Sequence, residues 1–198
     1  MPVLRNIAAA WQLLLTLPLP GDVRAANPGA WLWLPGLLVG LVLTGIGWTV
    51  LWLPAPVVAG LMLLTELLIT GGIHLDGWTD CWDGWGCRGN PEKHLAAVKD
   101  SRIGSLGAAA LTVLLLLKFS LYTIAAGTFI LIPTHMASRA VLTACARLFP
   151  CRDEGLGAGF ARKIALWHPL VNLLLAAAVF YLISGLAGII VIGAGFIC

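Results

Sequence analysis

The stretch LGAAALTVLLLLKFSLYTIAAGTFILIPTHMASRAVLTACARLF, residues 106–149, decides the fold class. Its 44 residues carry only three charges, on Lys118, Arg139 and Arg147. A helix needs about 20 residues to cross the hydrocarbon of a bilayer, so this stretch is long enough for two crossings. Gly127 near its centre marks the turn between them. These residues therefore predict a pair of transmembrane helices.

Other apolar runs predict further crossings on both sides of this pair. Trp31–Leu53 supplies 23 uncharged residues, and Val57–Thr70 follows after two prolines with a single acid, Glu66. Two shorter helices fit between residues 169 and 198. Ile7–Leu19 is too short to cross, and we expect it to lie at the membrane interface, with a signal peptide as the alternative. The fold class expected is all-α, a polytopic integral membrane bundle of about six transmembrane helices.

The composition agrees with a lipid environment and excludes other classes of protein. Apolar residues make up 60% of the chain and charged residues 11%, which is too hydrophobic for a soluble domain of 20.9 kDa. Five Cys are too few for a disulfide scaffold. Nucleic acid is not an expected partner, because the 12 basic residues are spread along the chain. We expect residues 1–198 to form one membrane domain whose partner is the lipid bilayer.

The positions of the basic residues predict a cytoplasmic N-terminus. Six crossings from there put ten of the 12 on the cytoplasmic side and none in the opposite loops. The ten are Arg5, Arg24, Arg88, Lys93, Lys99, Arg102, Arg147, Arg152, Arg162 and Lys163. This orientation places cytoplasmic loops at about 74–104 and 149–168 in a multi-pass protein of the cell inner (cytoplasmic) membrane.

Three aspartates in the first loop have a helical spacing. Asp76, Asp80 and Asp83 follow one another at i, i+4 and i+7, which puts them on one face of a helix. The residues expected on the opposite face are Trp78, Trp82 and Trp85. Neighbouring carboxylates repel one another, and hard oxygen ligands select Mg²⁺, Mn²⁺ or Ca²⁺, so the trio is a candidate metal site. The alternative is a solvated loop, because three nearby glycines weaken a helix.

The stretch Lys99-Asp100-Ser101-Arg102-Ile103-Gly104 precedes the next span and gathers two cations, a hydroxyl and a glycine. Backbone amides at that helix start, with Lys99 and Arg102, would form a phosphate site. The alternative is contact with lipid headgroups. A phosphate site beside a metal site is typical of phosphoryl transfer.

Two ionisable residues inside the predicted spans also need an explanation, because such residues are functional by default. Arg139 would neutralise phosphate charge or pair with Glu66. Glu66 could alternatively reach the headgroups at the end of its span.

Together these motifs resemble the signature of the cobalamin synthase family, the adenosylcobinamide-GDP ribazoletransferases. The stretches that carry the resemblance are Thr70–Asp80, Asp83-Gly84 and Lys99–Gly104, with Leu17–Pro20, Ser138-Arg139 and Glu154–Gly157 in the order that the family shows. The resemblance implies transfer of the cobinamide-phosphate group from adenosylcobinamide-GDP to α-ribazole or its 5′-phosphate. GMP would be released, adenosylcobalamin or its phosphate formed, and Mg²⁺ required.

Residue roles follow from placing that chemistry on the motifs. We expect Asp76, Asp80 and Asp83 to hold Mg²⁺, and either His74 or Asp100 to act as the base. His74 could instead be a structural hydrogen-bond partner, and Asp100 a further ligand of the metal. The expected substrate-binding residues are Lys99, Ser101, Arg102, Gly104, Arg139 and Glu154. The family pattern differs by having smaller apolar residues at the positions of Trp78 and Trp82, and by continuing past Cys198 to a Gly-Gly-x-Thr-Gly-Asp stretch.

Two other functions compete with this one. A CDP-alcohol-type phosphotransferase also uses clustered aspartates, but its pattern requires Ala-Arg where this chain has Asp80-Cys81. A divalent-cation transporter would need acids near the midplane of several spans, and only Glu66 qualifies.

Overall fold

The computed structural model describes residues 2–17, 26–87, 89, 91–100, 102–149 and 156–195. Every regular element in these ranges is a helix, which confirms the all-α class. In chain order the helices are α1 (Pro2–Leu14), η2 (Gly29–Trp31), α2 (Trp33–Gly47), η3 (Trp48–Leu51), α3 (Ala55–Thr70), α4 (Ile73–Gly86), α5 (Pro91–Lys99), α6 (Ser105–Ala125), α7 (Leu131–Leu148), α8 (Leu156–Ala161) and α9 (Trp167–Gly195).

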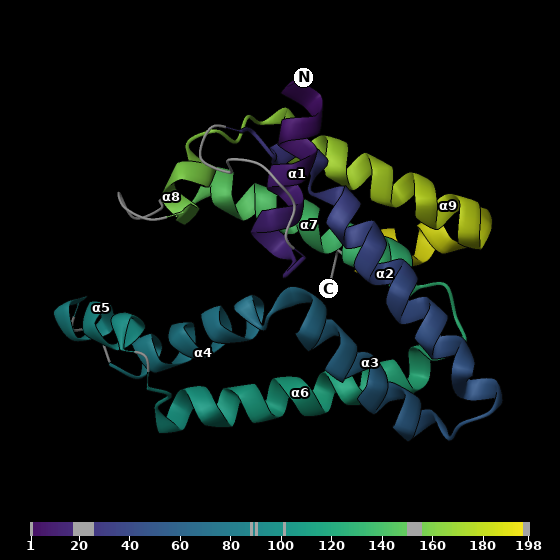
Figure 1. Ribbon diagram of the computed structural model, residues 1–198, viewed down its shortest axis with the longest axis horizontal. Helices are drawn as coiled ribbons and strands as arrows, with labels where there is room; N and C mark the ends of the chain where they lie inside the picture. Colours follow the sequence, from purple (N-terminus) through teal and green to yellow (C-terminus); the bar gives the residue numbers. More distant parts are fainter. Residues whose placement is uncertain are drawn as a thin grey trace.

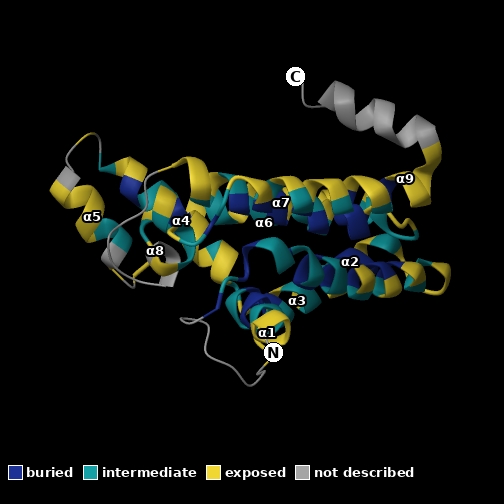
Figure 2. Cartoon of the chain, turned by 90° about the horizontal axis from the view of Figure 1, so that it is seen from above, coloured by how far each residue is buried: buried dark blue, intermediate teal, exposed yellow. Residues whose placement is uncertain are grey.

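The helices form two layers that are joined where α2 leads into α3 (Figure 1). One layer contains α2, α7 and α9, and α1 packs against α2. The other layer contains α3, α4 and α6, with α5 packed on α4. In Figure 2 the buried residues of α2 and α7 face each other, and much of the outer surface is exposed. Many of the exposed residues are large and apolar, with Leu116, Leu121 and Ile124 of α6 among them, and such a surface suits a protein that lipid surrounds.

A sharp bend separates α3 from α4. Prolines at the start of α3 fit the first helical turn, where the missing N–H would be unpaired in any case. The helix ends at Gly71 and Gly72, which adopt φ values of 64° and 70°. This left-handed conformation favours glycine, and the two helices meet at 90°. The bend turns α4 away from α3, so that α4 packs along α6.

Three helices in the described ranges are long and apolar enough to cross a membrane, or up to four if the bent pair α3–α4 is one span. The three are Gly29–Leu51, Ser105–Ala125 and Trp167–Gly185. The sequence predicts about six, and α3 and α7 account for part of the difference. α3 alone has 16 residues, and α7 carries polar side chains that lower its hydropathy.

Residues 106–149 form two helices, as predicted, but of these two only α6 is long and apolar enough to be a candidate membrane span. α6 and α7 are separate helices, and between them Gly127 has a φ of 79°. The two short helices predicted after residue 169 correspond to α9, which Gly185 interrupts with a φ of 66°.

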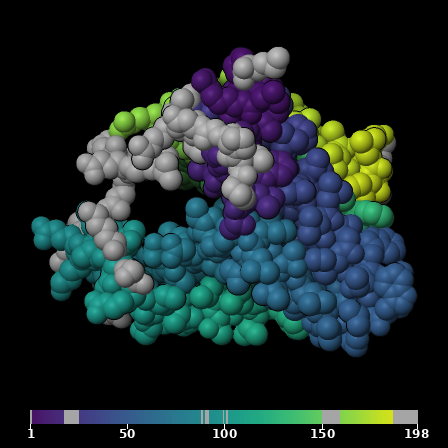
Figure 3. All heavy atoms as spheres, in the orientation of Figure 1, coloured from purple at the N-terminus to yellow at the C-terminus, as the bar shows by residue number. Residues whose placement is uncertain are grey.

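The N-terminal segment, for which the sequence predicts a position at the membrane interface, forms helix α1, and this helix begins earlier than the predicted run of residues 7–19. α1 buries Ala10 and Leu14 in the same core as Leu32 and Leu43. Figure 3 shows α1 in purple lying across the blue α2. Residues 18 and 19 of the predicted run lie outside the described residues.

The helices α2 and α7 pack closely against each other. A Cβ built on Gly36 would lie 2.6 Å from the carbonyl oxygen of His135, and one on Gly40 would lie 2.6 Å from the Cα of Ile132. Both glycines therefore allow the two backbones to touch, as small residues four apart do in membrane helix pairs.

A buried asparagine fixes α9 to the start of α2. The side-chain oxygen of Asn172 accepts a hydrogen bond of 2.8 Å from the amide of Trp33, and its nitrogen donates to the carbonyl of Gly29 at 2.8 Å. Asn172 is fully buried. A buried amide needs such partners, because an unpaired polar group in the interior is costly.

Candidate active site at the start of α6

The three aspartates lie on one helix, as their spacing predicts. α4 runs from Ile73 through Gly86, so the glycines within it do not prevent the helix. The tryptophans share a face of the helix, as their spacing predicts, and their rings are in contact: the ring centroids of Trp78 and Trp82 are 5.7 Å apart, and those of Trp82 and Trp85 are 5.3 Å apart. Edge-to-face contacts of this kind are favourable. The helix therefore has an acidic face and an aromatic face.

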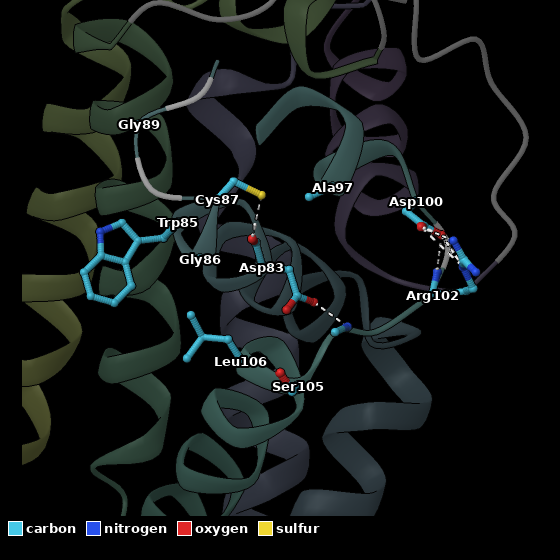
Figure 4. A pocket seen from close by; sticks show the side chains of 11 residues that line it. Asp83, Trp85, Gly86, Cys87, Gly89, Ala97, Asp100, Arg102, Ser105 and Leu106 are labelled. Carbon is cyan, nitrogen blue, oxygen red and sulfur yellow. Dashed lines mark hydrogen bonds and ion pairs between the residues drawn. The ribbon is translucent and has the colours of Figure 1, made fainter. Parts of the chain in front are cut away.

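Asp83 binds the N-terminus of α6. Its two carboxylate oxygens accept hydrogen bonds from the amides of Gly104 and Gly107, at 2.8 and 2.7 Å (Figure 4 draws the first). A helix N-terminus is a natural site for an anion. The sequence predicts phosphate at this helix start, but in the structure the anion is the side chain of Asp83. The amide of Gly104 is therefore already occupied.

Asp76 and Asp80 are the available carboxylates of the acidic face. Asp76 is exposed and Asp80 is half-buried. Neither has a hydrogen-bond or ion-pair partner within the described part of the chain, and the charges of Asp76 and Asp83 both act unfavourably on that of Asp80. Mg²⁺ is commonly held by one or two carboxylates together with substrate phosphates and water. This pair fits that donor set.

The full metal trio stays a prediction. Within the described ranges no group of three His, Cys, Asp or Glu side chains is gathered closely enough to hold a metal ion. Asp83 shares the helix face with Asp76 and Asp80, but both of its oxygens are bound to α6. Its observed role is to join α4 to α6.

Asp100 and Arg102 form an exposed ion pair near the same helix start. Arg102 donates through Nη2 to Oδ2 of Asp100 at 2.8 Å, and its amide donates to Oδ1 at 3.0 Å (Figure 4). These bonds lower the pKa of Asp100 to about 2. Because the pKa is depressed, the pair stays ionised at neutral pH and is lost only as the pH falls toward 2.

A cavity of about 790 Å³ lies between α4, α5 and the start of α6. Figure 4 shows Asp83 and the Asp100–Arg102 pair around it, with Trp85 and Leu106 at its apolar side. The residues that line it are Asp83, Trp85, Gly86, Cys87, Gly89, Ala97, Asp100, Arg102, Gly104, Ser105 and Leu106. The structure therefore brings Asp83, Asp100, Arg102 and Gly104 together at one cavity, but Asp76 and Asp80 are not among the residues that line it.

His74 and Arg139 lie at a different cavity, between α3, α6 and α7. Nη1 of Arg139 is 2.8 Å from Nε2 of His74. A guanidinium can only donate, so Nε2 of His74 accepts and the ring proton is on Nδ1. The lone pair that a general base would use is therefore occupied, and the predicted alternative of a structural hydrogen-bond partner describes the observed contact.

Glu66 pairs with Lys118 and not with Arg139. Oε2 of Glu66 is 2.5 Å from Nζ of Lys118 and accepts a hydrogen bond of 2.7 Å from the hydroxyl of Tyr122. Nε2 of His135 lies 3.5 Å from the same hydroxyl. The sequence motifs predict no role for Lys118, Tyr122 or His135. Lys118 could have been found, because it is the only charge in the α6 span and such a charge needs a partner.

Some predicted site residues cannot be placed. Ser101 and Glu154 lie outside the described residues, and the side chain of Lys99 is not described. Their expected roles in substrate binding stay predictions.

The contact between Asp83 and α6 makes a testable prediction about two glycines. A Cβ on Gly104 or Gly107 would overlap the Asp83 carboxylate. We expect Gly104→Ala and Gly107→Ala each to lower the free energy of unfolding by about 1 to 3 kcal/mol, the usual cost of overpacking. Thermal unfolding in detergent measures this. Gly77→Ala is the matched control, because a Cβ there meets nothing within 4 Å; equal stability of all three variants would contradict the prediction.

Comparison with known proteins identifies the family. The sequence profile of the cobalamin-5-phosphate synthase family matches residues 6–198. The chain belongs to this family. The match confirms the resemblance carried by the motifs from Thr70 to Gly104, and it favours this function over the two alternatives.

Curated relatives carry one name, adenosylcobinamide-GDP ribazoletransferase. The relative from Desulfitobacterium hafniense is 37% identical over 175 residues, which cover 81% of this chain and 68% of the relative. The relative from Geotalea daltonii is 32% identical over 198 residues, covering 94% and 79%. The relative from Shewanella oneidensis is 45% identical over 116 residues, covering 54% and 44%. These names make it a family of transferases. No solved structure matches the chain.

Proposed function

We propose that the protein is an adenosylcobinamide-GDP ribazoletransferase. It would transfer the cobinamide-phosphate group of adenosylcobinamide-GDP to α-ribazole or its 5′-phosphate and release GMP. Its place would be the cytoplasmic membrane, with the start of α6 on the cytoplasmic side. Beyond the family, the supporting observation is the unpartnered carboxylate pair Asp76 and Asp80, on the helix that Asp83 joins to the start of α6.

The proposed reaction requires a hydroxyl oxygen of ribazole to bond to the cobinamide-linked phosphorus. The diphosphate bridge breaks on the other side, and GMP leaves with the bridging oxygen. Asp76 and Asp80 would hold Mg²⁺. When bound, the ion would neutralise diphosphate charge and stabilise the leaving GMP.

This chain's own residues would position the substrate and accept the proton. Arg102 lies at the cavity edge, exposed and held by Asp100, where its guanidinium can contact a phosphate oxygen. Of the two predicted bases, Asp100 is exposed at the cavity although both of its oxygens accept hydrogen bonds from Arg102, whereas Nε2 of His74 lies at the other cavity and accepts from Arg139. A loose phosphoryl transition state places little demand on the base, so a carboxylate of low pKa can accept the hydroxyl proton.

The test is an assay of purified protein in liposomes with adenosylcobinamide-GDP and α-ribazole. We expect GMP and a cobalamin product to appear in equal amounts in the presence of Mg²⁺, and both to disappear when EDTA is added. α-Ribazole 5′-phosphate in a parallel reaction identifies the preferred acceptor. GMP release that does not depend on either acceptor, or no release under any of these conditions, would contradict the proposal.

A further inference from the structure

A second cavity, of about 840 Å³, lies between α3, α6 and α7. It is lined by two unlike sets of residues. One end contains the ionisable and polar groups Glu66, His74, Lys118, Tyr122, His135 and Arg139. The other walls are mainly apolar, with Leu121, Ile124 and Val141 among them. A site with a few polar groups at one end of an apolar space is typical of a ligand pocket.

The polar end carries more positive than negative charge. Its one carboxylate, Glu66, is bound to Lys118 and Tyr122. Arg139 has no carboxylate within ion-pair distance in the described ranges, and its contact is with Nε2 of His74, which must be neutral to accept. A cation at this depth normally pairs with an anion. Arg139 is therefore left without an ion-pair partner among the described residues.

Arg139 also has an unused donor. Its side chain lies on the wall of the cavity, and the residue is only 5% exposed. Nε is buried and has no hydrogen-bond partner. Leaving a buried charged donor unpaired is expensive. A guanidinium donates in a planar fork that matches two oxygens of a phosphate.

The apolar walls of the cavity open toward the lipid-facing surface. The exposed fractions of Leu121, Ile124 and Val141 are 62%, 78% and 55%. α6 is long and apolar enough to cross the bilayer, and only 11% of its apolar window is buried within the protein. A ligand could therefore enter between α6 and α7 from the membrane, with its apolar part against these side chains.

We propose that this cavity binds a phosphate ester with an apolar body, and that Arg139 holds the phosphate. Two kinds of molecule present a phosphate ester with an apolar body. One is an anionic phospholipid of the bilayer. The other is the nucleotide acceptor of the proposed reaction, whose aromatic base would occupy the apolar part, and this source rests on the proposed function.

Two binding experiments on the full chain distinguish the sources. Native mass spectrometry measures how many phosphatidylglycerol and phosphatidylcholine molecules the protein retains from an equimolar mixture. Equilibrium dialysis measures binding of α-ribazole 5′-phosphate to protein in nanodiscs of phosphatidylcholine alone. We expect one of the two anionic probes to bind, and Arg139→Gln to weaken that binding about tenfold or more, since a hydrogen bond to a charged group is lost.

Matched variants make the result specific to this side chain. Arg147→Gln removes an exposed arginine from the last turn of the same helix and should leave binding unchanged. Arg139→Lys keeps the charge but loses the fork, so it should bind at an intermediate level. It also serves as the test variant if Arg139→Gln does not fold.

Each result supports the proposal or overturns it. Selective retention of phosphatidylglycerol that depends on Arg139 identifies the lipid, and Arg139-dependent binding of ribazole phosphate identifies the nucleotide. If the wild-type protein binds neither probe, or if Arg147→Gln weakens binding as much as Arg139→Gln, the proposal is wrong. These binding measurements do not require turnover, so their outcome does not depend on whether the GMP assay succeeds.

Discussion

Replacing Asp76 or Asp80 by Asn is expected to lower the rate of GMP release by about a hundredfold or more, which corresponds to about 2.7 kcal/mol of activation free energy. Asn has nearly the same shape but no charge, so the change removes attraction for a divalent cation with little effect on packing. The half-saturating Mg²⁺ concentration should rise in both variants. Initial rates over a Mg²⁺ series in liposomes measure both effects.

Two further variants separate loss of metal binding from other causes. Glu92→Gln removes an exposed carboxylate from the neighbouring α5 and should leave the rate and the Mg²⁺ dependence unchanged. Asp83→Asn removes one of the two acceptors that hold the amides of α6, so it should lower thermal stability more than Mg²⁺ affinity. If Asp76→Asn and Asp80→Asn fold and keep wild-type rates, the carboxylate pair has no catalytic role.

Local periodicity predicted the acidic helix well because its cause is local. A spacing of i, i+4 and i+7 places Asp76, Asp80 and Asp83 on one face in any helix. The partner of Asp83 was not predictable in the same way. Gly104 and Gly107 are more than 20 residues away in sequence, and their contact with Asp83 depends on the 90° bend between α3 and α4.

The helix start at Gly104 shows a related limit. The sequence correctly marked it as a place for an anion, since its amides are unpaired within the helix. It could not specify which anion, because a carboxylate from α4 and a substrate phosphate satisfy the same amides. Only the packing of α4 on α6 decides that Asp83 is the occupant.

The ionisable residues inside the spans show what the cost of burying a charge predicts and what it does not. The rule that charges in a membrane must be paired indicated that Glu66 and Arg139 needed partners. It offered Glu66 with Arg139 as one pairing, whereas the observed pairs are Glu66 with Lys118 and Arg139 with His74. These pairs depend on which helices are neighbours, and one apolar helix looks much like another in sequence.

Replacing both Gly36 and Gly40 by Ala is expected to cost about 3 to 5 kcal/mol of stability, more than either change alone. Each added Cβ would lie 2.6 Å from a backbone atom of α7, and a backbone cannot move aside as a flexible side chain can. The helices must then separate, although Met136 and Leu43 beside them are fully buried. Thermal unfolding in detergent measures the loss.

The same separation should reach the cavity between α3, α6 and α7. α7 carries both His135 and Arg139, so displacing it moves the arginine away from His74 and weakens binding of the anionic probe. Gly45→Ala on the same helix α2 is the control, because a Cβ there meets nothing within 4 Å, so this change should not lower stability and should leave binding unchanged. If the double variant is as stable as Gly45→Ala, α2 and α7 do not pack through these glycines, and the position of Arg139 must be set by other contacts.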